Sequence, residues 1–152
     1  MSKVWIKMIE MILNVYLFWG ALQDVREKTI SHYFIKVGIL IGLTNCLWEI
    51  YLQVFYGKER ILSLVPGIVF LVIAKISAEK IGYGDGMVFL ILGSCMKPFE
   101  IWCLWQVSLW LDTIYSLIMV TIKKLQFHSK VAFLPFVWVA YNLLMLFKFV
   151  AG

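Results

Sequence analysis

Long apolar runs separated by short polar segments make up almost the whole chain. A helix that crosses the hydrocarbon core of a bilayer needs about 20 mostly apolar residues, and five of the runs are close to that length or longer. The remaining run, Gly86–Met96, extends only about 16 Å as a helix and follows a glycine-rich segment. This pattern predicts an all-α, polytopic membrane bundle of about six transmembrane helices in one domain, residues 1–152, with a short fourth helix. The predicted spans are Val4–Leu22, Tyr33–Phe55, Ile61–Ser77, Gly86–Met96, Phe99–Ile122 and Val131–Val150.

The composition agrees with a chain dissolved in lipid. Of the 152 residues, 62% are hydrophobic, against about 45–50% in a typical soluble domain. A soluble domain of this size buries only about 70% of the surface of its unfolded chain, so large apolar patches would stay exposed to water. We interpret the first run as a retained helix and not as a signal peptide, because Glu10 and Asn14 interrupt it and "WGALQD" is a poor cleavage site.

The basic residues predict the orientation. Lys and Arg give a net charge of +5 and occur mostly singly between apolar runs, which favours contact with anionic lipid headgroups over nucleic acid. The loops at 23–32, 75–86 and 123–130, with the flanking Lys36, hold eight basic residues, and the opposite side holds six. The positive-inside rule then places these three loops in the cytoplasm and both chain ends outside. The expected location is the cytoplasmic (inner) membrane, with several crossings.

Two carboxylates stand at the ends of predicted spans. Asp24 closes the first span, and Asp85 opens the fourth within "GYGD", so both are expected at the cytoplasmic boundary. Two aspartates held close can share one proton, and the pair can then activate water and protonate a carbonyl, as in aspartic peptidases. We expect Gly82 and Gly84 to adopt positive φ angles and to let the backbone and a peptide approach closely. The alternative is that both aspartates are only interfacial.

The other acidic residues have simpler interpretations. Asp112 lies in the middle of the fifth span, and we expect it to bond locally or to line a cavity. Glu49 and Glu100 fall near the outer boundary and are expected to be solvated. Glu79 follows Lys75 by four residues, a spacing typical of an ion pair on a helix.

The sequence gives no support for a metal or a cofactor. The three cysteines lie in apolar stretches without a C-x-x-C pair, which is typical of buried, inert thiols. The two histidines fall in separate loops and form no ligand set. These residues are Cys46, Cys95, Cys103, His32 and His128.

Three segments in order along the chain resemble the signatures of the type IV prepilin peptidases. "DVREKTIS" at Asp24–Ser31 is similar to their first signature, in which Asp is followed two places on by Arg or Lys and six on by Ile. "GYGD" at Gly82–Asp85 matches their G-x-G-D signature, and "VAFLPFV" at Val131–Val137 resembles their late V-P-F-x-P-F segment. With the six predicted helices, the resemblance covers nearly the whole chain.

The resemblance implies a membrane aspartic endopeptidase with Asp24 and Asp85 as catalytic residues, supported by Gly82 and Gly84. Members of the family cleave the basic leader from prepilins or prepilin-like proteins at the cytoplasmic face, just before a hydrophobic segment. Its partners would be such a prepilin and membrane lipid, with no cofactor. The larger members also methylate the new N-terminus and carry an insert with paired cysteines. Here the first loop has about ten residues and no cysteine, which favours a short, peptidase-only form like those of tight-adherence pili.

The chain departs from the family pattern in three places. Ser31 and His32 stand where many members have Pro-Asn, Ala132 replaces the first proline of the late segment, and Gly86-Met87 replaces a β-branched residue and lysine. These changes bear on subfamily and substrate preference more than on the chemistry.

Two other classes of function fit parts of the pattern. A small transporter could use Asp24, Asp85 and Asp112 as ion or proton sites, but it would predict inverted repeats, which the sequence does not show. A non-enzymatic membrane scaffold would predict that its polar residues are dispensable. Presenilin-like proteases also use G-x-G-D, but their fold has more helices than this length allows.

Overall fold

The computed structural model describes residues 3–52, 57–76, 82–122 and 131–152. Within these ranges the chain is all-α, as the sequence predicts, and contains no strand. Four of the helices (α1, α2, α5 and α6) are long and apolar enough to cross a membrane. The helices are α1 (Lys3–Glu27), α2 (His32–Tyr51), α3 (Gly57–Ile76), α4 (Tyr83–Cys95), α5 (Pro98–Thr121) and α6 (Leu134–Ala151).

Local signals set several helix ends. The side chain of Ser31 caps α2 by accepting a hydrogen bond from the Phe34 N–H at 3.2 Å. Pro98 begins α5, at a position where its missing N–H costs nothing. Pro66 lies inside α3. The predicted pairing of Lys75 with Glu79 lies outside the described residues.

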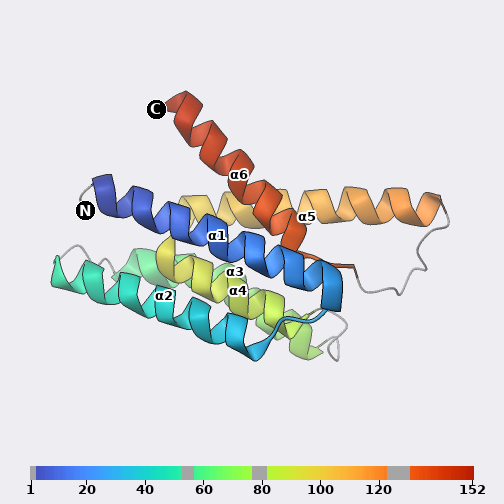
Figure 1. Ribbon diagram of the computed structural model, residues 1–152, viewed down its shortest axis with the longest axis horizontal. Coiled ribbons are helices and arrows are strands. Elements are labelled where there is room, and N and C mark those ends of the chain that lie inside the picture. The colour runs from blue at the N-terminus through green and yellow to red at the C-terminus, as the bar shows by residue number, and fades with distance from the viewer. Residues whose placement is uncertain (1–2, 53–56, 77–81, 123–130) are drawn as a thin grey trace.

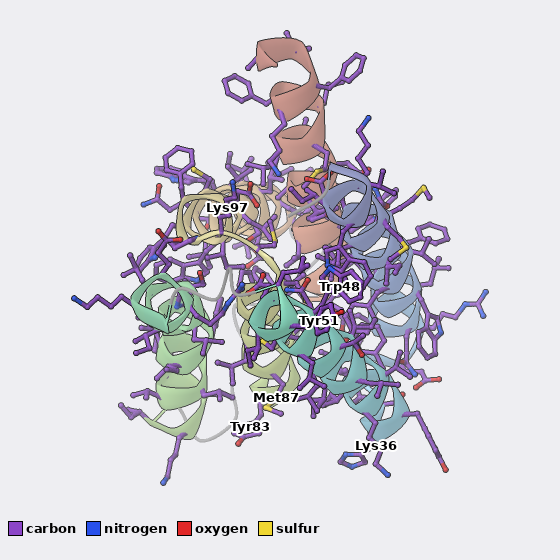
Figure 2. The ribbon with its side chains drawn as sticks, turned by 90° about the vertical axis from the view of Figure 1, so that its left-hand side faces the viewer. Lys36, Trp48, Tyr51, Tyr83, Met87 and Lys97 are labelled. Atoms are coloured by element: carbon purple, nitrogen blue, oxygen red, sulfur yellow. The ribbon has the colours of Figure 1, made fainter. Side chains whose placement is uncertain are left out.

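The short helix α4 is central to the bundle. Seen end-on, it lies between α2 and α3, with α1, α5 and α6 above them (Figures 1 and 2). Helices α3 and α4 approach closely because glycines meet neighbouring backbone at their interface. A Cβ on Gly67 would lie 2.6 Å from the Leu90 nitrogen, and one on Gly93 would collide with the Ser63 carbonyl oxygen. Small residues allow such close approach between membrane helices.

Apolar side chains lie on both the inside and the outside of the bundle. The interior is filled from all six described helices, and residues such as Leu40, Leu47, Trp110, Leu117 and Phe147 are exposed on the outer surface. In water such a surface would be unstable, so the distribution supports a membrane protein. The fully buried core includes Leu13, Leu17, Phe34, Phe89, Leu92, Leu104, Val137 and Tyr141. The cysteines are free and half-buried.

The expectation that Glu49 is solvated is wrong. Glu49 is only 5% exposed, and its carboxylate forms an ion pair with Arg60 and accepts a hydrogen bond from Asn45 Nδ2 at 3.1 Å. Arg60 also donates to the Gly93 and Met96 carbonyls at 3.1 and 3.3 Å. The guanidinium therefore satisfies carbonyls at the C-terminal end of α4 and joins that end to α2 and α3.

We expect Arg60→Met to destabilise the protein by about 3–5 kcal/mol, because it leaves the Glu49 carboxylate buried without its cation. Unfolding in detergent, followed by tryptophan fluorescence, measures the loss. The matched control is Lys58→Met on the exposed side of the same helix. Adding Glu49→Met to Arg60→Met should recover much of the stability. A double variant no more stable than Arg60→Met would contradict the account of a buried, unpaired charge.

Candidate active site

The C-terminal end of α1 and the N-terminal ends of α4 and α6 lie at the same end of the bundle (Figure 1). These ends carry the three segments that the sequence singles out. The two chain termini lie at the other end. Successive helices run in alternating directions, so α1 ends at the side of the bundle where α4 and α6 begin (Figure 1).

Asp24 links α1 to α6. It lies in the last turn of α1 and is only 6% exposed. Its Oδ2 accepts a hydrogen bond from the Leu134 N–H at 2.9 Å. The first N–H groups of a helix have no partner inside the helix, and a carboxylate there also meets the positive end of the helix dipole. Asp24 is therefore not an interfacial side chain free in solvent.

Asp85 lies in the first turn of α4 and is partly buried. Its N–H donates to the Gly82 carbonyl at 3.1 Å, and its carboxylate folds back over Gly82. The carboxylates of Asp24 and Asp112 both lie within electrostatic range of Asp85. The structure thus places Asp24, the other aspartate singled out by the sequence, and Asp112 of α5 within electrostatic range of Asp85.

The expectation of positive φ angles at Gly82 and Gly84 is wrong. Gly82 has φ −62° and ψ 118°, and no glycine in the described segments has a positive φ. The helix α4 begins inside the motif, so that Gly82 is its N-cap and Gly84 is already helical. Their contribution is space. A Cβ on Gly82 would lie 2.6 Å from Asp85 Oδ2, so glycine leaves room for that carboxylate.

Gly84 joins two of the three segments. A Cβ at this position would lie 2.7 Å from Cδ1 of Ile30 and 3.0 Å from its Cβ. Ile30 is six residues after Asp24, in the loop that leaves α1. The absence of a side chain at Gly84 therefore lets this loop pack directly on the first turn of α4. The neighbouring Tyr83 points away from the bundle and is 57% exposed (Figure 2).

Aromatic rings close the site toward the interior. Phe133, immediately before α6, packs on Phe70 of α3 and Phe89 of α4, with ring centroids 5.6 and 6.2 Å apart. Phe70 in turn meets the edge of the Trp105 ring on α5 at 6.1 Å. Because Phe133 adjoins the amide that holds Asp24, this cluster fixes the start of α6 against the centre of the bundle.

Three buried polar atoms have no hydrogen-bond partner among the described residues: Gln23 Oε1, Trp105 Nε1 and Asp112 Oδ1. Gln23 adjoins Asp24 and was not among the candidates from the sequence. The available signal was a polar side chain in the last turn of an apolar helix, directly before a candidate aspartate.

Within the described ranges, no group of three or more His, Cys, Asp or Glu side chains could hold a metal ion. His128 lies outside those ranges.

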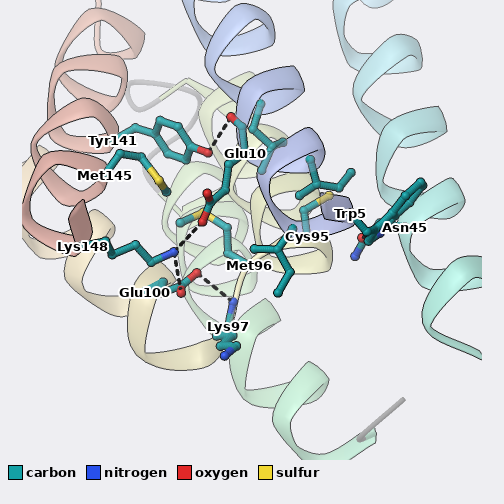
Figure 3. A pocket seen from close by; sticks show the side chains of 13 residues that line it. Trp5, Glu10, Asn45, Cys95, Met96, Lys97, Glu100, Tyr141, Met145 and Lys148 are labelled. Atoms are coloured by element: carbon teal, nitrogen blue, oxygen red, sulfur yellow. Dashed lines mark hydrogen bonds and ion pairs between the residues drawn. The ribbon is translucent and has the colours of Figure 1, made fainter. Parts of the chain in front are cut away.

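A cavity of about 180 Å³ lies at the opposite end of the bundle (Figure 3). Lys148 Nζ lies 2.8 Å from a carboxylate oxygen of Glu10 and 2.8 Å from one of Glu100. The expectation that Glu100 is simply solvated is therefore wrong, since its side chain is only 17% exposed and ion-paired. The Tyr141 hydroxyl donates to the Glu10 carbonyl at 2.9 Å. These bonds join α1, α5 and α6. Lys148 and the two glutamates are therefore paired with one another, and Asp24 and Asp85 at the other end remain the candidate catalytic residues.

Comparison with known protein families, characterised proteins and solved structures finds no match to this chain.

Proposed function

We propose that this protein is a membrane aspartic endopeptidase that removes the basic leader from type IV prepilins or prepilin-like proteins. One observation carries the proposal. Asp24 and Asp85 lie within electrostatic range of each other at the end of the bundle where the Leu134 N–H, in the third segment, donates to Asp24. All three segments that resemble prepilin-peptidase signatures thus converge, although they lie far apart in the sequence.

The geometry supports distinct roles for the two aspartates. The Leu134 N–H at the start of α6 stabilises the ionised form of Asp24, and we assign Asp24 as the base that takes a proton from water. Asp85, close to a second carboxylate, holds the shared proton and donates it to the carbonyl oxygen of the substrate. The water oxygen attacks the carbonyl carbon, and the amide C–N bond then breaks as the leaving nitrogen takes a proton. The products are a leader carboxylate and a new amino terminus.

The same proposal places α3 and α4 in the membrane, which makes six membrane helices. The site then faces the cytoplasm, because the loops that the sequence assigns to that side carry eight basic residues against six on the other. Helix α4 is too short to cross alone, and the packing of α2 and α3 around it allows its N-terminal end to open to water beside the bundle.

Purified protein in detergent, mixed with a prepilin encoded near its gene, tests the function. We expect the prepilin to lose its leader, with one oxygen from ¹⁸O-labelled water entering the leader's new carboxylate. A transporter or a scaffold gives no cleavage. Cleavage without ¹⁸O incorporation would contradict direct attack by water.

We expect a prepilin whose leader glycine is replaced by a bulky residue to resist cleavage in both lipid and detergent. In the proposed mechanism the peptide passes between Asp24 and Asp85, which lie within electrostatic range of each other, and a small residue at the cut leaves room for both carboxylates to reach the bond. Initial rates with the two substrates, in neutral detergent and in anionic liposomes, measure the effect. Normal cleavage of the bulky variant would show that the approach to the aspartates is wider than this arrangement requires.

Neutralising the leader lysines should slow cleavage mainly in anionic liposomes. The enzyme's cytoplasmic loops carry more basic than acidic residues, so they do not attract a basic leader. Anionic lipid holds it instead, by about 1 kcal/mol per Lys or Arg. The same substrates in neutral detergent are the control. An equally large loss there would mean that acidic side chains of the enzyme read the leader charge, with Glu27 and Glu79 the first to replace.

A further inference from the structure

Asp112 has a buried oxygen for which the described residues supply no donor. Its Oδ1 is inaccessible to solvent and has no hydrogen-bond partner in the part of the chain that the structure describes. A carboxylate in the middle of an apolar helix is costly, and a buried acceptor without a donor adds to that cost. Unsatisfied buried groups are rare in folded proteins, and a ligand that supplies the missing donor is one explanation.

The register of α5 directs Asp112 toward the candidate active site. Trp105, Ser108 and Asp112 are spaced by three, four and seven residues and share one face of the helix. Ser108 is fully buried, and Trp105 packs on Phe70, which contacts Phe133 beside the start of α6. From Trp105 to Asp112 the helix advances about 10 Å along this face, toward the end where α1 closes and α4 begins (Figure 1).

We propose that Asp112 is a positioning residue, whose free Oδ1 accepts a hydrogen bond from a backbone N–H of the substrate just after the bond that is cut. This role rests on the proposed peptidase function. In that reaction the cut bond lies directly before a hydrophobic helix, and the first N–H groups of any helix lack intrahelical partners. A carboxylate at such a helix end satisfies one of them and meets the positive end of the helix dipole.

A pair of substitutions separates this role from a structural one. Asp112→Leu removes the acceptor, and we expect KM to rise by about 10- to 100-fold, because this is the loss of binding expected when a hydrogen bond to a charged group is removed. Asp112→Asn keeps an acceptor oxygen and should raise KM by no more than about 5- to 10-fold, because a neutral hydrogen bond replaces a charged one. Because leucine removes an unsatisfied buried group, the thermal stability of Asp112→Leu should equal or exceed that of wild type. If leucine does not fit, Asp112→Ala gives the same comparison.

The matched control is Gln106→Leu, which makes a similar change on the exposed side of the same helix and should leave KM unchanged. The probe is a synthetic peptide with a lysine-rich leader, a glycine at the cut and an apolar segment. N-methylation removes one backbone N–H at a time in the first turn after the cut. At the position that meets Asp112, methylation should raise KM for wild type but add nothing in Asp112→Leu.

Unchanged KM in Asp112→Leu, or fully additive effects of methylation and substitution, would overturn this role while the peptidase function stands. A loss of activity in Asp112→Leu that only follows a loss of stability would overturn it as well. No cleavage of the unmethylated peptide or of a full prepilin by wild type would overturn the peptidase function, and the role of Asp112 with it.

Discussion

Asp24→Asn and Asp85→Asn should each abolish cleavage while the protein still folds and inserts. An amide keeps the shape of the carboxylate but cannot carry the proton, and loss of general acid–base function alone costs about 10²–10⁴ in rate. In Asp24→Asn the remaining carbonyl oxygen can still accept the Leu134 N–H, so the contact between α1 and α6 is kept. The double variant should be little worse than either single variant, because the pair acts as a unit. Initial rates of leader removal measure all three.

The same experiment tests whether Asp24 only caps α6. If capping were its whole contribution, Asp24→Asn would keep activity and only Asp24→Leu, which removes the acceptor, would lose stability. The matched control is Glu27→Gln, an exposed acid at the last residue of α1, which should cleave normally. Near-normal turnover by Asp24→Asn or Asp85→Asn would remove that residue from the catalytic role.

The hydrophobic pattern predicts the helices well because apolar length alone determines which segments a bilayer accepts. The four long apolar helices correspond to predicted spans, and the observed helix ends differ from the predicted ends by only a few residues. The start of α4 was placed too late, at Gly86 instead of Tyr83. Glycine lowers the helix propensity of that segment, but Gly82 can serve as an N-cap and packing against α3 overrides the propensity that remains.

Position at the ends of the predicted helices predicts part of the candidate site. Asp24 and Asp85 were expected at the same boundary, and the structure brings their carboxylates within electrostatic range. The amide partner of Asp24 could not be predicted, because Leu134 is 110 residues away and only tertiary packing brings it near. The expectation that Glu49 and Glu100 are solvated failed for a related reason. Their distance from the apolar centre of a span does not predict the ion pairs that they form with Arg60 and Lys148.

The packing of Ile30 on Gly84 gives the second large expected effect. Gly84→Val should reduce cleavage by about 10²-fold, the cost of displacing a catalytic group by roughly 1 Å. The first added carbon would already lie 2.7 Å from Cδ1 of Ile30, so either the loop after Asp24 or the first turn carrying Asp85 must move. Both movements change how the two carboxylates face each other. Folding stability should fall much less than activity, since the displaced atoms belong to a partly exposed loop side chain.

Rescue by a second substitution identifies the cause. Gly84→Ala alone should be impaired, and Ile30→Ala in the same chain should restore much of the activity, because it removes Cδ1 and Cγ1, two of the three atoms that a Cβ on Gly84 would meet. Gly93→Ala is the matched control, since it adds the same methyl group at the far end of α4, against the Ser63 backbone. That variant should lose stability but keep its activity per folded molecule. If Ile30→Ala does not improve Gly84→Ala, then the glycine is needed for access of the substrate and not for the contact between α4 and the loop that follows α1.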